Sequence, residues 1–212
     1  IKPVEGRMES IGNIKNNSKV ILDYAHTPDA LKYTLESIKE QFGQSSISIV
    51  FGCGGDRDKD KRSIMGKIAN QYCNKIFLTD DNPRYENPKK IRNQIKKKIV
   101  RSKLVEIASR KKAIKVSIEN LNSGDILLVA GKGHEIYQEY RGKKKNFSDK
   151  KYILKEINSK NKKLFKNWKA NILNEKCNLS LVNKKLKINK ASINSKNIKK
   201  NDIFFAIKGP KN

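Results

Sequence analysis

The chain has 212 residues, a formal net charge of +27 at pH 7 and 33% charged residues. This length allows one well-formed hydrophobic core and a second small unit. No run approaches the roughly 18 consecutive apolar residues that a transmembrane helix needs, which excludes a membrane span. The first residues do not resemble a signal peptide but the interior of a longer protein, and the last ones stop just after a strand-like run. We therefore expect a fragment.

The positive charge raises the question of nucleic-acid binding. Only eight of the 48 basic residues are arginine, and the lysines occur together with abundant Asn and Ile, as a genome-wide bias toward A/T-rich codons would produce. The lysines are scattered, without interleaved aromatic residues or an RNP-type motif. The densest stretch, 143–169, is favoured as solvated surface and linker. We expect no specific nucleic-acid partner, and only weak binding to polyanions at low salt.

The cysteines and histidines do not form a metal-binding pattern. Cys53, Cys73 and Cys177 show neither CxxC nor metal-ligand spacing, which is typical of reduced thiols in a cytosolic protein. The two histidines, His26 and His134, are too few to complete a zinc site with them. We expect a cytoplasmic protein with no metal ligands in this chain.

Short β-rich runs alternate with runs of helical periodicity. In chain order, the pattern predicts a strand at 19–23, a helix at 28–41, a strand at 47–51, a helix at 61–72, a strand at 75–78, a helix at 88–100, a strand at 104–107, a helix at 110–121 and a strand at 125–130. A hairpin of 136–140 with 144–147 and a helix at 148–157 follow. This order predicts the α/β class, with a Rossmann-like, mostly parallel sheet and helices on both faces, in a domain of residues 1–157.

The pattern changes after this domain. Residues 158–166 read as a lysine-rich linker, and 167–212 read as the truncated start of a second, β-containing domain. Within the second domain we expect a short helix at 168–175 and strands at 186–188 and 203–207.

Four polar loops follow predicted strands, at 23–28, 51–58, 80–84 and 130–135. In an open α/β sheet, ligands bind outside the carboxyl ends of the strands. Each loop alone would be weak evidence. Because all four converge on one edge of the predicted sheet, they favour a ligand site there.

The loop 80–84 is the most informative of the four. It places two acids, an amide and Arg84 around Pro83, whose fixed φ partly organises the loop. The acids and the amide offer acceptors for an ammonium group, and the guanidinium offers a planar donor fork for a carboxylate. An amino acid carries both groups and is the expected ligand. Taken alone, the loop favours an ordinary turn with a helix cap, and the ligand site is preferred only because other polar loops recur at the same edge of the predicted sheet.

The glycine-rich loops match no nucleotide fingerprint. Neither 52–55 nor 131–133 fits GxGxxG or GxxxxGK[ST], so we predict neither a dinucleotide site nor a Walker loop from them. The glycines either serve tight turns with positive φ or let the backbone approach a ligand closely, with Arg57 and Glu135 beside it. His26 is equally well explained as a structural residue and as a nucleotide contact.

Taken together and in order, these motifs resemble the C-terminal domain of the Mur ligases, in particular the diaminopimelate-adding branch. The resemblance covers roughly residues 3–157 and rests on the segments 6–9, 23–28, 51–58 with Lys61 and Arg62, 80–84 and 131–135. It implies an ATP-dependent ligase of peptidoglycan precursor synthesis. Such an enzyme activates the D-glutamate carboxylate of UDP-N-acetylmuramoyl-L-alanyl-D-glutamate as an acyl phosphate, and the amine of meso-diaminopimelate then attacks it.

The same resemblance assigns roles to residues. It implies a diaminopimelate site of Arg57, Asp81, Asn82, Pro83, Arg84, Gly131 and Glu135, and ATP contacts from Arg7, Asp23 and His26. Arg57 and Arg84 can pair bidentately with the second carboxylate, which lysine lacks. An arginine left unpaired would therefore penalise lysine. The resemblance places the Walker loop and the Mg²⁺ ligands in a central ATPase domain upstream, so the isolated chain should be inactive and should hold no catalytic residue.

The tail carries a second resemblance. Segments 190–196 and 202–209 are similar to the opening of the N-terminal, UDP-binding type of domain in a D-alanyl-D-alanine-adding (MurF-like) ligase of the same family. Where the family has Asp–Ser–Arg, this chain has Asn194–Ser195–Lys196, so only Ser195 matches as a contact to the UDP part. This predicts a bifunctional fusion, and the alternative is a generic β-rich extension.

Two other functions remain open on sequence grounds. One is a lysine-adding or folylpolyglutamate synthase-like ligase with the same fold, which the loop 80–84 argues against. The other is a basic nucleic-acid-binding α/β module, which would leave the four loops unexplained.

Overall fold

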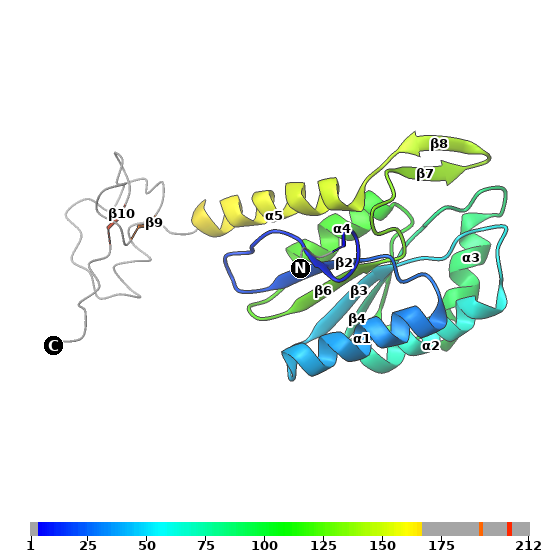
Figure 1. Cartoon of the computed structure of the whole chain (residues 1–212), viewed down its shortest axis with the longest axis horizontal. Helices are drawn as coiled ribbons and strands as arrows, with labels where there is room; N and C mark the ends of the chain where they lie inside the picture. The colour runs from blue at the N-terminus through cyan, green and yellow to red at the C-terminus, as the bar shows by residue number, and fades with distance from the viewer. Residues whose placement is uncertain (1–3, 167–190, 193–202, 205–212) are drawn as a thin grey trace. The chain divides into compact units, whose positions relative to one another are not determined.

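The computed structural model describes residues 4–166, 191–192 and 203–204 (Figure 1). The chain divides into two compact units, residues 1–158 and 159–212. In the second unit, β9 (Ala191–Ser192) and β10 (Ile203–Phe204) pair in parallel. The predicted helix at 168–175, the predicted strand at 186–188 and Ser195 lie outside the described residues.

The first unit is built on a six-stranded sheet with the order β1-β2-β6-β3-β4-β5. Its strands are β1 (Glu9–Ser10), β2 (Lys19–Asp23), β3 (Ile47–Phe51), β4 (Lys75–Leu78), β5 (Leu104–Glu106) and β6 (Ile126–Ala130). Only β1, which the sequence pattern did not predict, is antiparallel to its neighbour. The predicted mostly parallel α/β sheet is therefore confirmed.

Helices cover both faces of this sheet (Figure 1). They are α1 (Pro28–Phe42), α2 (Asp60–Tyr72), α3 (Pro88–Ile95), α4 (Arg110–Glu119) and α5 (Asp149–Lys166), with 3₁₀ turns η1 (Lys96–Lys98) and η2 (Arg101–Lys103). Helices α1 to α3 share one buried apolar cluster with alternate residues of the strands, while α4 and α5 lie on the opposite face. Strand β6 is apolar and buried along its whole length, as expected for a strand covered on both faces.

Local signals fix where the helices begin, and hence where the loops at the strand ends stop. The Thr27 hydroxyl accepts a hydrogen bond from the N–H of Ala30 at 3.3 Å, and Pro28 occupies the first turn of α1. Asn87 caps α3 in the same way, ahead of Pro88. These caps keep the segments 24–27 and 79–87 short and out of the helices.

Two predicted boundaries differ from the structure. Helix α3 ends at Ile95 and is followed by η1, so it is shorter than the predicted 88–100. Residues 158–166, predicted as a linker, instead continue α5. The reason is that Ile153, Ile157 and Lys160 are buried at helical spacing and no Gly or Pro interrupts the segment. The predicted domain boundaries themselves stay predictions.

A hairpin projects beside the carboxyl ends of the strands (Figure 1). It pairs β7 (Tyr137–Tyr140) with β8 (Lys143–Asn146) in antiparallel fashion, close to the predicted limits. Arg141 and Gly142 form its turn with φ of 49° and 71°, the left-handed geometry that suits a two-residue hairpin loop. Over the part of the chain that the structure describes, no helix is long and apolar enough to cross a membrane.

Candidate functional site

The sheet topology brings the four polar loops together. Strands β2, β6, β3 and β4 are consecutive parallel neighbours, so their carboxyl ends lie on one edge. Because β6 lies between β2 and β3, the loop after it lies between the loops that follow them. Backbone hydrogen bonds join the loops directly: Gly131 N–H donates to Asp23 O at 3.1 Å, and Gly55 N–H donates to Asn82 O at 2.8 Å.

A buried lysine lies at the centre of the predicted amino-acid site. The Lys132 ammonium, whose side chain is fully buried, lies 3.3 Å from Asp81 Oδ1, 3.0 Å from Asn82 Oδ1 and 2.7 Å from Glu135 Oε2. The Asn82 amide also donates to Glu135 Oε2 at 3.0 Å. Three predicted site residues thus meet around one cation that the sequence analysis did not single out.

The charges of this cluster do not cancel. Asp81 and Glu135 contribute two carboxylates, and Lys132 contributes one ammonium within contact distance. The cluster therefore retains one negative charge at an edge of the sheet where ligands bind. A second ammonium group is the complementary ligand for such a site.

The two predicted arginines flank the same glycine. Arg84 Nη1 donates to Gly55 O at 2.7 Å, while Arg57 is exposed and donates only weakly, to Asp56 O at 3.4 Å. A Cβ placed on Gly54 would lie 2.9 Å from Arg84 Nη1 and 3.9 Å from Arg57 Cγ. The side chains of Arg84 and Arg57 thus both border the backbone at Gly54.

The glycine loops are needed for close packing between loops. Gly131 has φ of +108°, and a Cβ there would lie 3.1 Å from Asp81 Oδ2. At Gly55, a Cβ would fall on the carbonyl oxygen of Pro83. The positive φ that was one predicted reason for glycine therefore applies at Gly131, while close approach to a ligand stays a prediction. The group that approaches Gly131 in this structure is the Asp81 carboxylate.

The fully buried Arg62 holds the loop 52–57 in place through hydrogen bonds. Arg62 Nη2 donates to Gly54 O at 3.0 Å and to Glu86 Oε1 at 2.8 Å. The same Glu86 oxygen accepts from the N–H of Asp56 at 2.7 Å. The hydrogen bonds from Arg62 lower the pKa of Glu86 to about 2. Arg62 was noted only as part of a motif, and its role as an anchor was not predicted.

The first acid of the loop 80–84 points away from the lysine cluster. Asp80 forms an ion pair with Arg92 and accepts a hydrogen bond from the Tyr140 hydroxyl at 3.1 Å. Burial raises the pKa of the Asp80 carboxyl, against the opposing effect of Arg92. Burial and the neighbouring Asp80 also raise the pKa of Tyr140. Asp80 therefore serves the architecture of the loop, while Asp81 faces the cluster.

The residues predicted for the nucleotide form a second cluster. Asp23 is buried and accepts hydrogen bonds from the N–H groups of Met8 and Ala25, both at 2.7 Å. Arg7 and His26 are exposed and meet over one ring: the Arg7 guanidinium lies 5.0 Å from the centroid of Tyr24, and the His26 ring packs edge-on at 4.6 Å. Asp23 thus orders the loop, and Tyr24, which was not predicted, joins the other two residues.

The loop after β6 connects the two clusters. His134 lies beside Tyr24, with ring centroids 5.4 Å apart, whereas Lys132 and Glu135 reach the amino-acid cluster. Behind this loop, the fully buried Arg110 pairs with Asp149 at 2.6 Å and donates to Ala130 O at 2.9 Å. This buried pair ties α4 and α5 to the end of β6, and nothing in the sequence pattern indicated it.

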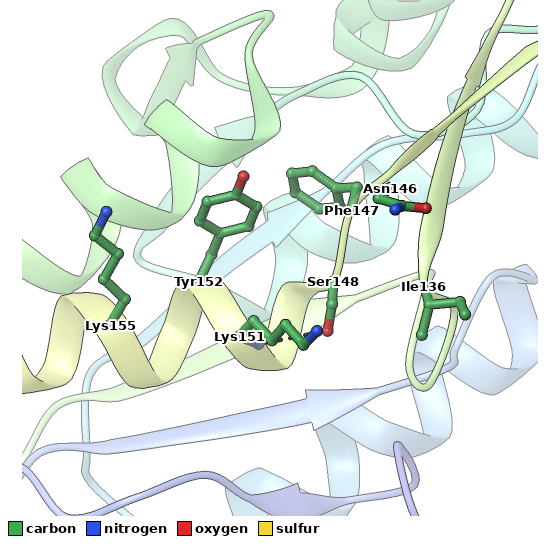
Figure 2. Close-up of a pocket in the computed structure, with 7 residues that line it drawn as sticks. All are labelled: Ile136, Asn146, Phe147, Ser148, Lys151, Tyr152 and Lys155. Carbon is green, nitrogen blue, oxygen red and sulfur yellow. Dashed lines mark hydrogen bonds between the residues drawn. The ribbon is translucent and has the colours of Figure 1, made fainter.

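The hollows of the surface lie beside the clusters. A hollow of about 390 Å³ is bordered by Arg84, Tyr85, Tyr140 and Arg141. A second one, of about 430 Å³, lies between the base of the hairpin and α5 (Figure 2). The residues that line the second hollow are Ile136, Asn146, Phe147, Ser148, Lys151, Tyr152 and Lys155. Only the first hollow contains a predicted site residue.

No group of three His, Cys, Asp or Glu side chains gathers to hold a metal within residues 4–166 or the described pairs 191–192 and 203–204. The two site carboxylates, Asp81 and Glu135, are instead paired with Lys132. This donor set does not suit Mg²⁺, which prefers several oxygen ligands and water.

A mostly parallel α/β sheet with polar loops gathered at its carboxyl edge defines a Rossmann-like ligand-binding domain.

The family described as "Mur ligase, glutamate ligase domain" matches residues 6–133. The UDP-N-acetylmuramoyl-L-alanyl-D-glutamate–2,6-diaminopimelate ligase of Rickettsia felis is 49% identical over 156 residues, 73% of this chain and 29% of the relative. The ligase of the same name from Rickettsia conorii is 51% identical over 73% of this chain and 32% of the relative.

A solved structure of a ligase of that name superposes with a TM-score of 0.68 at 40% identity, covering 75% of this chain and 32% of that chain. This chain belongs to the Mur ligase family, and it contains the C-terminal domain of such a ligase. It spans about a third of the length of the relatives that it matches.

Proposed function

We propose that this chain carries the amino-acid-selecting domain of an ATP-dependent ligase that adds meso-diaminopimelate to UDP-N-acetylmuramoyl-L-alanyl-D-glutamate in the cytoplasm. The observation that carries the proposal is the cluster of Asp81, Asn82 and Glu135 around one buried ammonium, next to Arg84. Relatives about 50% identical, which carry that activity in their names, support it.

The domain would hold the incoming amino acid at the end that does not react. The excess negative charge of Asp81 and Glu135 suits the distal ammonium, and the guanidinium groups of Arg57 and Arg84 suit the distal carboxylate. Lysine has no such carboxylate, so Arg57 and Arg84 would keep only their contacts within the protein, and lysine would bind more weakly than diaminopimelate. We therefore assign the selection of diaminopimelate over lysine to Arg57 and Arg84.

The reaction itself would take place at the opposite end of the amino acid. ATP transfers its γ-phosphoryl group to the D-glutamate carboxylate, giving an acyl phosphate and ADP. The amine attacks the acyl carbon, the C–N bond forms as the C–O bond to phosphate breaks, and the nitrogen loses its proton. We assign phosphoryl transfer, with ATP and Mg²⁺, to a central ATPase domain of the longer protein, so this chain by itself would be inactive.

The second cluster would face the nucleotide. Arg7 and His26 are exposed and both contact the Tyr24 ring, which suits contacts to a phosphate or to a planar base. Asp23 would act indirectly, because its carboxylate is buried and bonded to the backbone of Met8. Closure of this edge onto the central domain would complete both sites.

For the tail, we propose that residues 167–212 begin a MurF-like domain and that Ser195 contacts the UDP part of its substrate. The support is the resemblance of segments 190–196 and 202–209 to such a domain. In that case one protein would carry two successive ligases. Sequencing the transcript beyond the codon for Asn212 of this chain tests this directly, because a continuous second ligase is expected and an early stop codon would contradict it.

The experiment for the main proposal uses the full-length native enzyme. Phosphate release from ATP is followed with the UDP-muramoyl dipeptide as acceptor and either meso-diaminopimelate or L-lysine as the amine. Turnover with diaminopimelate alone is expected. Turnover with lysine would retain the ligase and contradict the selectivity, and no turnover with either would contradict the proposal.

A further inference from the structure

The strand β7 runs along the loop 80–84 and bonds to nearly every residue of it. The side chain of Gln138, which is 8% exposed, donates to two successive carbonyl oxygens, Asp80 O at 3.1 Å and Asp81 O at 2.7 Å. One amide group therefore fixes two peptide units of the loop. Because one amide group bonds to both carbonyl oxygens, it fixes the orientation of the backbone at Asp80 and Asp81.

The next residue of β7 contacts the next part of the loop. The N–H of Glu139 donates to Asn82 Oδ1 at 3.0 Å, and its carbonyl accepts from the N–H of Arg84 at 3.2 Å. Its carboxylate lies 3.8 Å from Arg84 Nε. The strand thus orients the Asn82 amide, and it holds Arg84 at φ of 51°, a backbone region that non-glycine residues seldom adopt.

Tyr140, the next residue of β7, also contacts the loop 80–84. The Tyr140 hydroxyl donates to Asp80 Oδ2 at 3.1 Å, and Tyr140 forms a parallel bridge with Arg84. The N–H of Arg141 donates to Arg84 O at 2.7 Å. Three successive residues of β7 and the first residue of the turn therefore hold the loop from one side, in addition to its bonds to Arg92, Lys132 and Gly55.

We propose that β7 is a positioning strand for the amino-acid site, with Gln138 and Tyr140 as positioning residues that set selectivity without touching the ligand. The inference rests on the proposed function. Gln138 aims the peptide units that carry Asp81 and Asn82, and Tyr140 fixes Asp80 so that the loop reaches Arg84 in one conformation. A misplacement of these groups by a fraction of an ångström weakens binding of the amino acid and leaves the nucleotide cluster unchanged.

The hairpin is anchored independently of these bonds, so variants at Gln138 and Tyr140 should fold. Its base is closed by the hydrogen bond from Phe147 N–H to Ile136 O at 2.9 Å, and the Phe147 ring packs on Tyr152 of α5 at 4.9 Å (Figure 2). A cavity of about 300 Å³ borders Asp80, Gln138 and Tyr140. Its lining includes polar groups such as Asp80 and Ser109, and it is large enough for water to satisfy carbonyl groups that a variant leaves free.

The test compares Gln138→Met and Tyr140→Phe with the unmodified full-length enzyme. Each change nearly keeps the size of the side chain and removes its hydrogen-bonding group. Tyr33→Phe is the matched control, because Tyr33 lies 73% exposed on α1, far along the chain from the site. Urea unfolding verifies that every variant is folded.

Gln138→Met is expected to raise the KM for diaminopimelate about tenfold and Tyr140→Phe about threefold, each corresponding to one or two lost hydrogen bonds. The KM for ATP should stay within about twofold, and the preference for diaminopimelate over lysine should fall. Equal changes for all substrates, or a lower kcat at unchanged KM, would indicate a merely structural role and overturn the inference. An unmodified enzyme inactive with diaminopimelate would overturn the proposed function as well.

Discussion

Replacement of Lys132 by Met removes a charge from the centre of the amino-acid cluster while nearly preserving its volume. The Lys132 side chain is fully buried, and its ammonium contacts Asp81, Asn82 and Glu135 at 2.7 to 3.3 Å. The variant leaves two carboxylates close together without a cation. It also leaves the Asn82 carbonyl oxygen with one donor fewer, since only the N–H of Glu139 remains.

The expected loss in the free energy of unfolding follows from these contacts. Removing one partner of a buried ion pair costs about 3–5 kcal/mol, because the other charge stays buried and unpaired. The side chain of Asp81 is 9% exposed and that of Glu135 is 21% exposed, so water screens part of the effect. We expect a loss of about 3 kcal/mol in the free energy of unfolding, or roughly 9 °C in Tm for a unit of this size.

The assay is urea and thermal unfolding of the chain, followed by far-UV circular dichroism. Lys143→Met is the matched control, since Lys143 is exposed in β8, and its change should stay within about 0.5 kcal/mol. If Lys132→Met unfolds at the same urea concentration as the control, the Lys132 ammonium does not stabilise the buried carboxylates of Asp81 and Glu135, and the charge argument for an ammonium-binding site fails.

Three further predictions concern Arg84 and the two ion pairs Arg110–Asp149 and Arg62–Glu86. In the full-length enzyme, Arg84→Ala should raise the KM for diaminopimelate about tenfold or more and that for ATP much less; equal effects would remove the role assigned to Arg84. Arg110→Met should lower the free energy of unfolding by about 3–5 kcal/mol, because Asp149 would remain fully buried and unpaired; an unchanged urea midpoint would contradict this. Because Arg62 lowers the pKa of Glu86 from 4.5 to about 2, this pair stabilises the fold above about pH 4.5, and its contribution is lost as the pH falls toward 2. The difference in unfolding free energy between the unmodified chain and Glu86→Gln should shrink over that window, and a constant difference would refute the linkage.

The parallel sheet could be predicted because its signals are local. Strands β2, β3 and β4 have the bounds that the sequence pattern predicts, since each is a short apolar run bounded by polar or glycine residues. The same pattern located the four loops at the carboxyl edge. The convergence of those loops followed from the fold class alone.

The interior of the site could not be predicted, because it depends on contacts between distant segments. Lys132 stands between two glycines and reads as a solvated loop residue, yet its burial results from contacts with residues about fifty positions away. Arg110 and Asp149 likewise resemble surface residues of two helices until both are placed over Ala130. The helical segment 158–166 was predicted as a linker because its many lysines obscure the buried spacing of Ile157 and Lys160.

We propose that the carboxyl edge of this sheet selects diaminopimelate. The most direct measurement is a crystal structure of the full-length enzyme with meso-diaminopimelate. We expect the distal carboxylate within hydrogen-bonding distance of Arg84 and the distal ammonium near Asp81 and Glu135, with Lys132 still buried beside them. Diaminopimelate bound away from these residues, or bound with its reacting amine against Arg84, would contradict the account.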